Sequence, residues 1–399
     1  MNTTIKIFMA SIAFAALFQF TGCNEECGGT ALRGTWVKDF DQGIGYTILE
    51  SADGGYLYVN YDSFGTGTSL SKIDSAGEDV WSTALSGLSV VAEDVDGGLF
   101  VAGGSYYVTQ VSRLNSSGGI LWSRTFEGSG GLKYLVATSD GNAVATTYLD
   151  PDGNSVGNIS VVKLDQNGTA IWTRVLDFSD DNYPHGVVAT EDGGVTLLVE
   201  GFDYAKQGDS SKSSPVGIST FRLLRLAGDG TEEWNIVQPR GTLSGGSLAA
   251  TNDGGCAILD YGMLVRFDTR GEILWVKAYE SALGSARGIL HAVPGGGFIV
   301  GSSSNVEGPG PFYFQSCGNI VLTRLDENGD ITGEREYDTG AIEYLLDFAP
   351  TSDGGNIIVG QKRRGFGGFW KSFLLKVDGD GAGGKEIIED VNGILVDGE

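Results

Sequence analysis

The feature that most constrains the fold of this chain is a sevenfold internal repeat. Its first landmark is Asp-Gly-Gly, or a close variant, followed by an apolar run, as in DGGYLYV at Asp53–Val59. The glycine pair is expected to supply the positive φ angles of a two-residue hairpin turn that leads into the apolar strand. The seven copies, 42 to 61 residues apart, begin at Asp53, Asp96, Asp140, Asp192, Asp253, Gly295 and Asp353.

A second landmark lies between these copies and is typified by KLDQNGTAIW at Lys163–Trp172. A basic residue starts the motif, a tight turn ending in Gly follows, and Trp comes nine positions after the base. Complete copies are Lys72–Trp81, Arg113–Trp122, Lys163–Trp172, Arg225–Trp234 and Arg266–Trp275, whereas the copies starting at Arg324 and Lys376 lack the Trp. A catalytic residue is needed once, so this recurrence indicates that the tryptophans pack between sheets. The turn aspartates, such as Asp74 and Asp165, are expected to cap their own turns.

Together the two landmarks predict four short strands in each unit. Repeats of this kind, in a chain with 64 Gly and only 8 Pro, indicate an all-β, seven-bladed β-propeller of four-stranded antiparallel blades. A propeller has to close, because its first and last sheets otherwise expose free edges. We predict that the N-terminal segment from Thr35 to Phe40, with Trp36, supplies the outer strand of the seventh blade. The competing candidate is the C-terminal segment GKEIIEDV.

The unit VVKLDQNGTAIWTRVL at Val161–Leu176 resembles the tryptophan-docked repeats of the pyrroloquinoline-quinone-like propellers. That group includes quinoprotein dehydrogenases and the propeller lipoprotein of the outer-membrane β-barrel assembly machinery. The shared residues are the Asp, the Gly and the Trp four residues after that Gly. These are framework residues, so the resemblance implies the fold and leaves the activity open. The quinone cofactor needs a dedicated residue set in an eight-bladed frame, and no cofactor is expected here.

The N-terminus has the layout of an export signal. Residues 1–22 contain one lysine, an apolar run too short to span a bilayer comfortably, and small residues at the end. Phe20-Thr21-Gly22-Cys23 resembles the lipobox of bacterial lipoproteins, with Phe20 in place of the usual Leu. We therefore predict a signal peptide over 1–22, lipid attachment at Cys23, a tether over 23–34 and the propeller over 35–399. The protein would be anchored at the outer membrane or cell surface. An ordinary cleaved signal with an incidental cysteine is the alternative.

Charge and cysteine usage exclude several classes of function. With 51 acidic against 26 basic residues the formal net charge is −25, which repels a phosphate backbone and disfavours nucleic-acid binding. Cys256 lies in the apolar run GGCAIL and is predicted to be a buried, inert thiol. Cys27 and Cys317 are candidates for a disulfide that the sequence alone leaves open. DENGD at Asp326–Asp330 lacks the spacing of a calcium loop, so no metal site is expected.

The variable loops are the best candidates for function. In a propeller, the loops between the second and third strands and those between blades open on one face, where the long insertions of this chain would gather. A basic and aromatic cluster in QKRRGFGGFWK favours binding through stacking and cation–π contacts. Alternatively, Phe369 and Trp370 begin the third strand and pack inward. The predicted binding residues are Tyr183 and His185 of the inter-blade stretch SDDNYPHG, together with Tyr204, Phe312, Tyr313, Arg363, Arg364, Phe366, Phe369 and Trp370.

These observations favour a non-enzymatic, envelope-anchored, monomeric propeller lipoprotein that binds a protein or glycan partner through its loop-rich face. The alternative is an extracellular polysaccharide hydrolase or lyase with its site in the same mouth. Only His185 and His291 are available as imidazole bases, and no GxSxG nucleophile elbow occurs. No catalytic residue is assigned. Carboxylates from different blades within glycosidase distance would favour the alternative.

Overall fold

The computed structural model describes the repeat region with gaps at several loops. The described residues are 36–40, 44–61, 67–85, 87–105, 108–127, 129–149, 157–204, 217–238, 246–279, 288–303, 318–338, 341–363, 370–379, 385–389 and 395–397. These residues form strands and turns, and none of them lies in a helix. The prediction of an all-β chain is confirmed for this part of the molecule.

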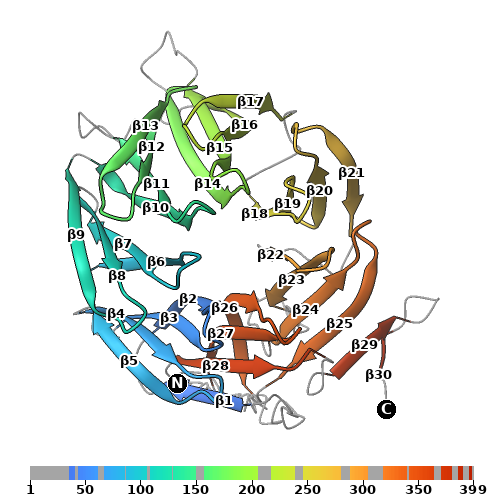
Figure 1. Cartoon of the computed structure of the whole chain (residues 1–399). Coiled ribbons are helices and arrows are strands. Elements are labelled where there is room, and N and C mark those ends of the chain that lie inside the picture. The colour runs from blue at the N-terminus through green and yellow to red at the C-terminus, as the bar shows by residue number, and fades with distance from the viewer. Residues whose placement is uncertain are drawn as a thin grey trace, which may run out of the picture.

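Seven antiparallel sheets are arranged around a central axis, with the first strand of each nearest the axis (Figure 1). Blades one to three are β2 (Ile44–Glu50), β3 (Tyr56–Tyr61), β4 (Thr68–Ile73) and β5 (Asp79–Ala84); β6 (Leu88–Glu93), β7 (Leu99–Ser105), β8 (Val108–Leu114) and β9 (Ile120–Glu127); and β10 (Ser129–Ala137), β11 (Ala143–Leu149), β12 (Asn158–Leu164) and β13 (Ala170–Leu176). Blades four and five are β14 (Asp181–Ala189), β15 (Val195–Tyr204), β16 (Gly217–Leu226) and β17 (Glu232–Val237); and β18 (Ser247–Ala250), β19 (Cys256–Asp260), β20 (Met263–Phe267) and β21 (Ile273–Ala278).

Blade six holds β22 (Ile289–Ala292), β23 (Phe298–Ser303), β24 (Ile320–Leu325) and β25 (Ile331–Tyr337). Blade seven holds β26 (Ile342–Pro350), β27 (Asn356–Arg363), β28 (Lys371–Val377) and, as its outer strand, β1 (Trp36–Phe40). The register pairs Trp36 with Lys376 and Lys38 with Leu374. The predicted closure by the N-terminal segment is therefore confirmed.

The competing C-terminal segment lies elsewhere. Its strand β29 (Lys385–Glu389) pairs with β25 and is followed by β30 (Leu395–Asp397), so that blade six becomes a six-stranded sheet. Figure 1 shows both strands on the outside of the ring. The two chain ends thus have different roles: the N-terminal strand closes the ring, and the C-terminal strands extend one blade outward.

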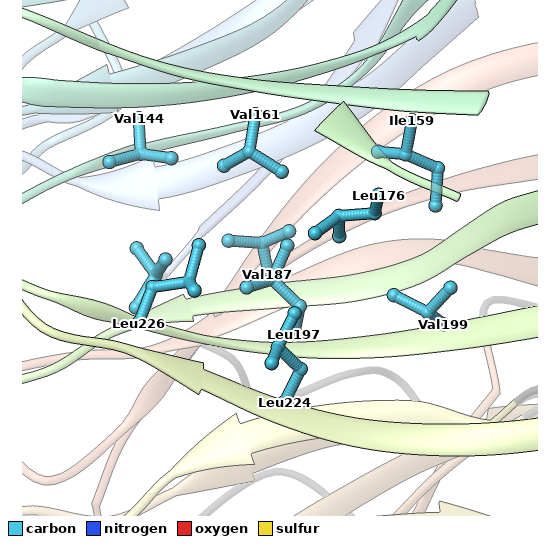
Figure 2. Packing of buried hydrophobic residues seen from close by; sticks show 10 residues of the cluster. Val144, Ile159, Val161, Leu176, Val187, Leu197, Val199, Leu224 and Leu226 are labelled. Carbon is cyan, nitrogen blue, oxygen red and sulfur yellow. The ribbon is translucent and has the colours of Figure 1, made fainter. Parts of the chain in front are cut away.

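The hydrophobic core is divided among the seven seams between neighbouring blades. At the seam between blades three and four, Val144, Val161 and Leu176 face Val187 and Leu197 (Figure 2). The second and third strands are buried on both faces because each blade is covered by a neighbour on either side. The fourth strands alternate between exposed and half-buried positions, as in DVWSTA of β5.

The Asp-Gly-Gly turn differs from the predicted two-residue hairpin. In blade one, Gly54 N donates to Ser51 O at 2.8 Å and Ser51 N to Gly55 O at 2.7 Å, so the connection is a four-residue turn closed by a bulge. Between Ser51 and Gly55 in this turn, Gly54 alone has a positive φ, +88°. Gly55 is required for a different reason: a Cβ there would lie 2.4 Å from Ile73 O.

The recurring tryptophans dock each blade onto the next one. In blade three, Trp172 Nε1 donates to Gly228 O of blade four at 2.9 Å, and the indole stacks on Gly230, where a Cβ would lie 2.7 Å from the ring. The equivalent bonds are Trp36 to Ser75 O, Trp81 to Ser116 O, Trp122 to Gln166 O and Trp234 to Thr269 O, at 2.6 to 3.1 Å. The prediction that these residues are structural is confirmed.

In five blades the basic residue of the second landmark pairs with the aspartate of the first, and in blade two Arg113 pairs with Asp94, two residues before that landmark. Lys163 is 1% exposed and its Nζ lies 2.5 Å from Asp140 Oδ2, while it also donates to Gly193 O and Gly228 O of blade four. The other pairs are Lys72 with Asp53, Arg113 with Asp94, Arg225 with Asp192, Arg266 with Asp253 and Lys376 with Asp353. Each pair lets a buried cation tie the third strand to the turn.

The turn aspartates accept hydrogen bonds from their own turns, as predicted. Asp165 Oδ1 accepts Asn167 N and Thr169 N at 2.8 Å, and Asp326 accepts the corresponding bonds from Asn328 N and Asp330 N. DENGD is thus a capped hairpin turn, and the described residues include no cluster of three or more metal-ligating side chains.

Cys256 is 1% exposed and free, and burial raises the pKa of its thiol to about 12, which confirms the expected inert thiol. The predicted signal peptide, the tether with Cys23, and both Cys27 and Cys317 lie outside the described residues. In the described part of the chain, no helix has the length and apolar character needed to cross a membrane.

Candidate functional site

The two faces of the ring differ in what they carry. The Asp-Gly-Gly turns and the tryptophan-docking turns lie at one end of every blade, which we call the turn face. First strands begin and second strands end at the opposite end, the loop face, which also receives the variable loops. Residues that recur in each blade dominate the turn face. The side chains described below occur once and lie at the loop face.

Asp181 is the centre of a tyrosine cluster that comprises Tyr148, Tyr183 and Tyr204. Asp181 is the first residue of β14 and is 2% exposed. Its Oδ1 accepts Gly157 N at 2.9 Å, and its Oδ2 accepts the hydroxyls of Tyr183, at 3.2 Å, and Tyr204. One buried carboxylate thus fixes two half-buried phenol rings at the loop face of blade four.

Blade three completes the cluster. Tyr148, near the end of β11, meets Tyr183 edge to face with 5.7 Å between ring centroids, a favoured aromatic geometry. The exposed Lys133 places its Nζ 4.8 Å from the centroid of the Tyr148 ring. The cluster therefore crosses the seam between two blades and offers ring surface beside a cation.

The phenols of the cluster remain hydrogen-bond donors at neutral pH. Burial and the negative charge of Asp181 raise the pKa of Tyr183 to about 12. The hydrogen bond to Asp181 raises the pKa of Tyr204, and burial raises that of Tyr148. Such hydroxyls are not poised to act as general bases, which need a pKa near the working pH.

His185 lies beside the cluster and is held by a carboxylate. Its Nε2 is 2.8 Å from Glu200 Oε2, and Glu200 Oε1 accepts Ser219 Oγ at 2.5 Å. The ring packs at 5.4 Å from Phe221. Tyr183 and His185 were expected in an inter-blade loop, but both lie within β14, because pairing with β15 already starts at Asp181. A register shift between Pro184 and Gly186 places His185 at an irregularity of the innermost strand.

A pocket of about 370 Å³ opens next to His185, between the first strands of blades three to six. Tyr134, Ser247, Asp260 and Tyr261 contribute to its walls. Tyr261 is 67% exposed and has φ +43°, the one positive value among the described non-glycine residues. With Gly262 it forms the two-residue turn between β19 and β20. Because this connection of blade five is so short, the pocket opens at the loop face.

A second patch, the blade-seven patch, consists of Tyr344, Arg363 and Trp370. Trp370 directly precedes β28 and is 38% exposed. The Arg363 guanidinium lies 4.7 Å from the indole centroid, and the centroid of the Tyr344 ring lies 5.1 Å from it. Trp370 thus starts the third strand yet stays accessible. Lys362 instead pairs with Asp39 of the closing strand at 2.6 Å.

The structure separates the predicted site residues into these two groups. Tyr183, His185 and Tyr204 belong to blade four, whereas Arg363 and Trp370 belong to blade seven, on the opposite side of the ring (Figure 1). Phe312, Tyr313, Arg364, Phe366 and Phe369 lie outside the described residues. Sequence reasoning missed Asp181, Glu200 and Tyr148. Their one common signal is a polar or aromatic residue at the loop-face end of an inner strand, where the repeat requires none.

Comparisons with known proteins support the fold. No family model matches the chain, and no curated protein matches its sequence. The Pan2 WD40 domain of Neurospora crassa is similar, with a TM-score of 0.53, 12% identity, and coverage of 84% of this chain and 89% of that one. A chain of the mitotic checkpoint complex has a TM-score of 0.53 at 11% identity, covering 95% of this chain and 100% of that one.

The acylaminoacyl peptidase of Pyrococcus horikoshii has a TM-score of 0.50 at 11% identity, and the match covers 84% of this chain and 52% of that one. This chain therefore spans about half the length of the peptidase. At these identities the likeness concerns the propeller architecture alone, and a propeller is consistent with a binding or scaffold role.

Proposed function

We propose that this chain is an exported, lipid-anchored binding propeller that holds an envelope partner, a glycan in the first place, on its loop face. The observation that carries the proposal is the tyrosine cluster with the adjacent His185 pocket. Sugars are bound by ring faces that cover their C–H surfaces and by fixed donors and acceptors that meet their hydroxyls. Tyr148 and Tyr183 offer the ring faces, and Asp181 and Glu200 hold the polar groups in place.

The charge distribution supports a neutral or basic glycan over an anionic one. The chain has a formal charge of −25, and carboxylates of Asp181, Glu200 and Asp260 lie at the site. Lys133 is the one cation identified at the tyrosine cluster within the described residues. A polyanion would meet net repulsion over most of this face.

A glycan array probed with the folded protein tests the proposal. Binding of one or more neutral glycans is expected, and Tyr183→Ala and His185→Ala should each weaken it at least tenfold. Trp370→Ala is the matched aromatic control at the other side of the ring and should retain binding if the cluster is the site. Loss with Trp370→Ala alone would move the site to the blade-seven patch. Capture of an envelope protein instead of any glycan would replace the proposed ligand class.

The polysaccharide hydrolase or lyase alternative is tested on the same material. Incubation of each bound glycan with the native protein should leave its chain length unchanged. Turnover that one carboxylate variant, such as Glu200→Gln, abolishes would establish an enzyme and overturn the binding-only proposal.

The proposed anchor is tested separately. Metabolic labelling with a fatty-acid analogue should modify the native chain, and Cys23→Ser should remove the label and release the protein from the envelope. Retention of the label in Cys23→Ser would contradict lipid attachment at this residue.

A further inference from the structure

The seam between blades six and seven lacks the tryptophan that docks the other blades. Strand register places Gly333 opposite Arg324, at the position where Trp172 stands opposite Lys163 in blade three. The seventh tryptophan of the chain, Trp370, lies at the loop face instead. A Cβ built on Gly333 would meet no atom within 4 Å. The place that an indole fills elsewhere is therefore open on the blade-six side.

On the receiving side of this seam, blade seven is described as far as Gly379, just after β28. In blade four the docking carbonyl is that of Gly228, three residues after the base Arg225. The same position in blade seven, three residues after Lys376, is Gly379. A pocket of about 180 Å³ lies between the two sides, lined among others by Leu322, Arg324, Gly333, Tyr337, Asn356 and Gly379. These residues come from both blades, so the pocket occupies the seam itself.

Arg324 adds a cation to this pocket. In the other six blades the corresponding base pairs with an aspartate in or just before the first landmark, but blade six has Gly295 where the others have Asp. Arg324 Nη2 donates instead to Gly354 O of blade seven at 2.6 Å. A guanidinium held beside an apolar wall favours the electron-rich face of an aromatic ring.

We propose that this seam pocket binds an indole-sized aromatic group that carries an N–H donor. Five tryptophan seams of the same molecule show what fits: an indole whose N–H is directed to a backbone carbonyl of the next blade, at the position that Gly379 holds here. The outer strand β25 already pairs with β29 at Arg335 and Glu336, so the seam is offered to a ring rather than to a partner strand. The ring belongs either to a free indole compound or to a tryptophan side chain of another polypeptide.

Saturation-transfer NMR of the full chain with indole tests the site, with 1-methylindole as the matched ligand without the donor. Saturable binding of indole is expected at a dissociation constant of about 1 mM or tighter. Binding of 1-methylindole should be at least fivefold weaker. Absence of saturable transfer from the native chain, or equal binding of the two ligands, would overturn the proposal.

Gly333→Trp supplies the missing indole from the chain itself and should abolish indole binding while raising Tm. Gly67→Trp is the control, because Gly67 is exposed with open space around it, and it should bind indole like the native chain. If Gly333→Trp does not fold, Gly333→Leu fills part of the same space and should weaken binding. Indole binding unchanged in either folded Gly333 variant contradicts the site.

A further arm identifies the source of the ring. N-acetyltryptophanamide that binds as tightly as indole supports a tryptophan side chain of another polypeptide, because the pocket then tolerates a backbone. Binding of indole alone supports a free compound. Neither arm involves the loop face, so this result stands or falls independently of the proposed glycan site.

Discussion

The turn face and the loop face of this propeller differ in whether their side-chain contacts recur from blade to blade. On the turn face every blade except blade six repeats the same contacts: a basic residue reaches a carboxylate, and an indole docks on the next turn, as Lys163 and Trp172 do. On the loop face the tyrosine cluster and the pair His185–Glu200 occur once. Repeated contacts indicate a structural role, because a ring has a seam between every two neighbouring blades. Residues that occur once are free of that requirement, and a binding site needs only one copy.

The largest expected effect is on the frame. Trp172→Ala removes a docking indole and its hydrogen bond to Gly228 O, and should lower the free energy of unfolding by about 3 kcal/mol. Trp370→Ala removes the same side chain from an exposed position and should cost less than about 1 kcal/mol. Urea denaturation followed by circular dichroism compares the two. Equal losses would remove the distinction between docking and surface tryptophans.

The next effect concerns the buried cations. Lys163→Ala leaves Asp140 without its partner and two carbonyls of blade four without a donor, and should cost about 2–3 kcal/mol. The value stays below that of a fully buried pair because Asp140 is 42% exposed. Lys133→Ala, at an exposed lysine of the same blade, should change stability by less than about 0.5 kcal/mol. A Lys163→Ala protein as stable as the Lys133→Ala protein would show that the pair is dispensable.

Asp347 is an exception to the contrast between recurring framework residues and single binding residues, because it occurs once and yet has a structural role. It lies at a register shift of β26, where its carboxylate accepts Ile48 N of blade one at 3.1 Å and Phe348 N at 2.9 Å. Burial raises its pKa to about 7. The folded state therefore holds a proton that the unfolded state has released above about pH 4, and the stability that this group contributes falls as pH rises toward 7.

Asp347→Asn removes that dependence. Between pH 5 and pH 8 the stability of the variant should gain on that of the native protein by about 2–3 kcal/mol. Comparing the two proteins cancels the titration of all other groups, including His291, whose pKa burial lowers to about 4. Urea midpoints at several pH values measure the difference. A difference that stays constant from pH 5 to pH 8 would show that Asp347 does not titrate in this window.

A smaller effect on stability is expected from removing one hydroxyl at the tyrosine cluster of the loop face. Tyr204→Phe keeps the ring and removes one hydroxyl donor from Asp181, which should cost about 1 kcal/mol. Glycan binding should weaken more than this stability loss suggests, since the freed carboxylate changes the polar surface of the cluster. Thermal unfolding and calorimetric titration on one sample separate the two. A large drop in stability without a change in affinity would make Tyr204 a frame residue.

The fold was predictable because its determinants recur. The seven turn landmarks predicted the number of blades. The last repeat lacks a Trp-bearing outer strand and Trp36 belongs to no complete repeat, so the N-terminal segment was predicted to supply that strand. The predicted turn type was wrong, because Asp-Gly-Gly also suits a longer turn in which only Gly54 needs a positive φ. Gly55 is required because a Cβ at this position would collide with Ile73 O on the neighbouring part of the chain. A local sequence pattern does not reveal this contact.

The site was predictable only in part. Tyr183, His185 and Tyr204 stood out as aromatic and polar residues near long loops, but their partners did not. Asp181 and Glu200 are two among 51 acidic residues, and nothing in their spacing distinguishes them. The contact of Tyr148 with Tyr183 joins two blades and depends on how neighbouring sheets face each other across a seam. Contacts of this kind form between neighbouring blades of the closed ring, so they cannot be predicted from the sequence of a single repeat.

The most direct test of the account is the affinity of the identified glycan for Tyr183→Ala and for Trp172→Ala, measured by calorimetry on samples of known folded fraction. We expect at least a tenfold loss of affinity with little loss of stability for Tyr183→Ala. For Trp172→Ala we expect the folded fraction to keep native affinity despite the large loss of stability. The reverse pattern, in which the docking tryptophan controls binding and Tyr183 does not, would contradict the assignment of function to the residues that occur once.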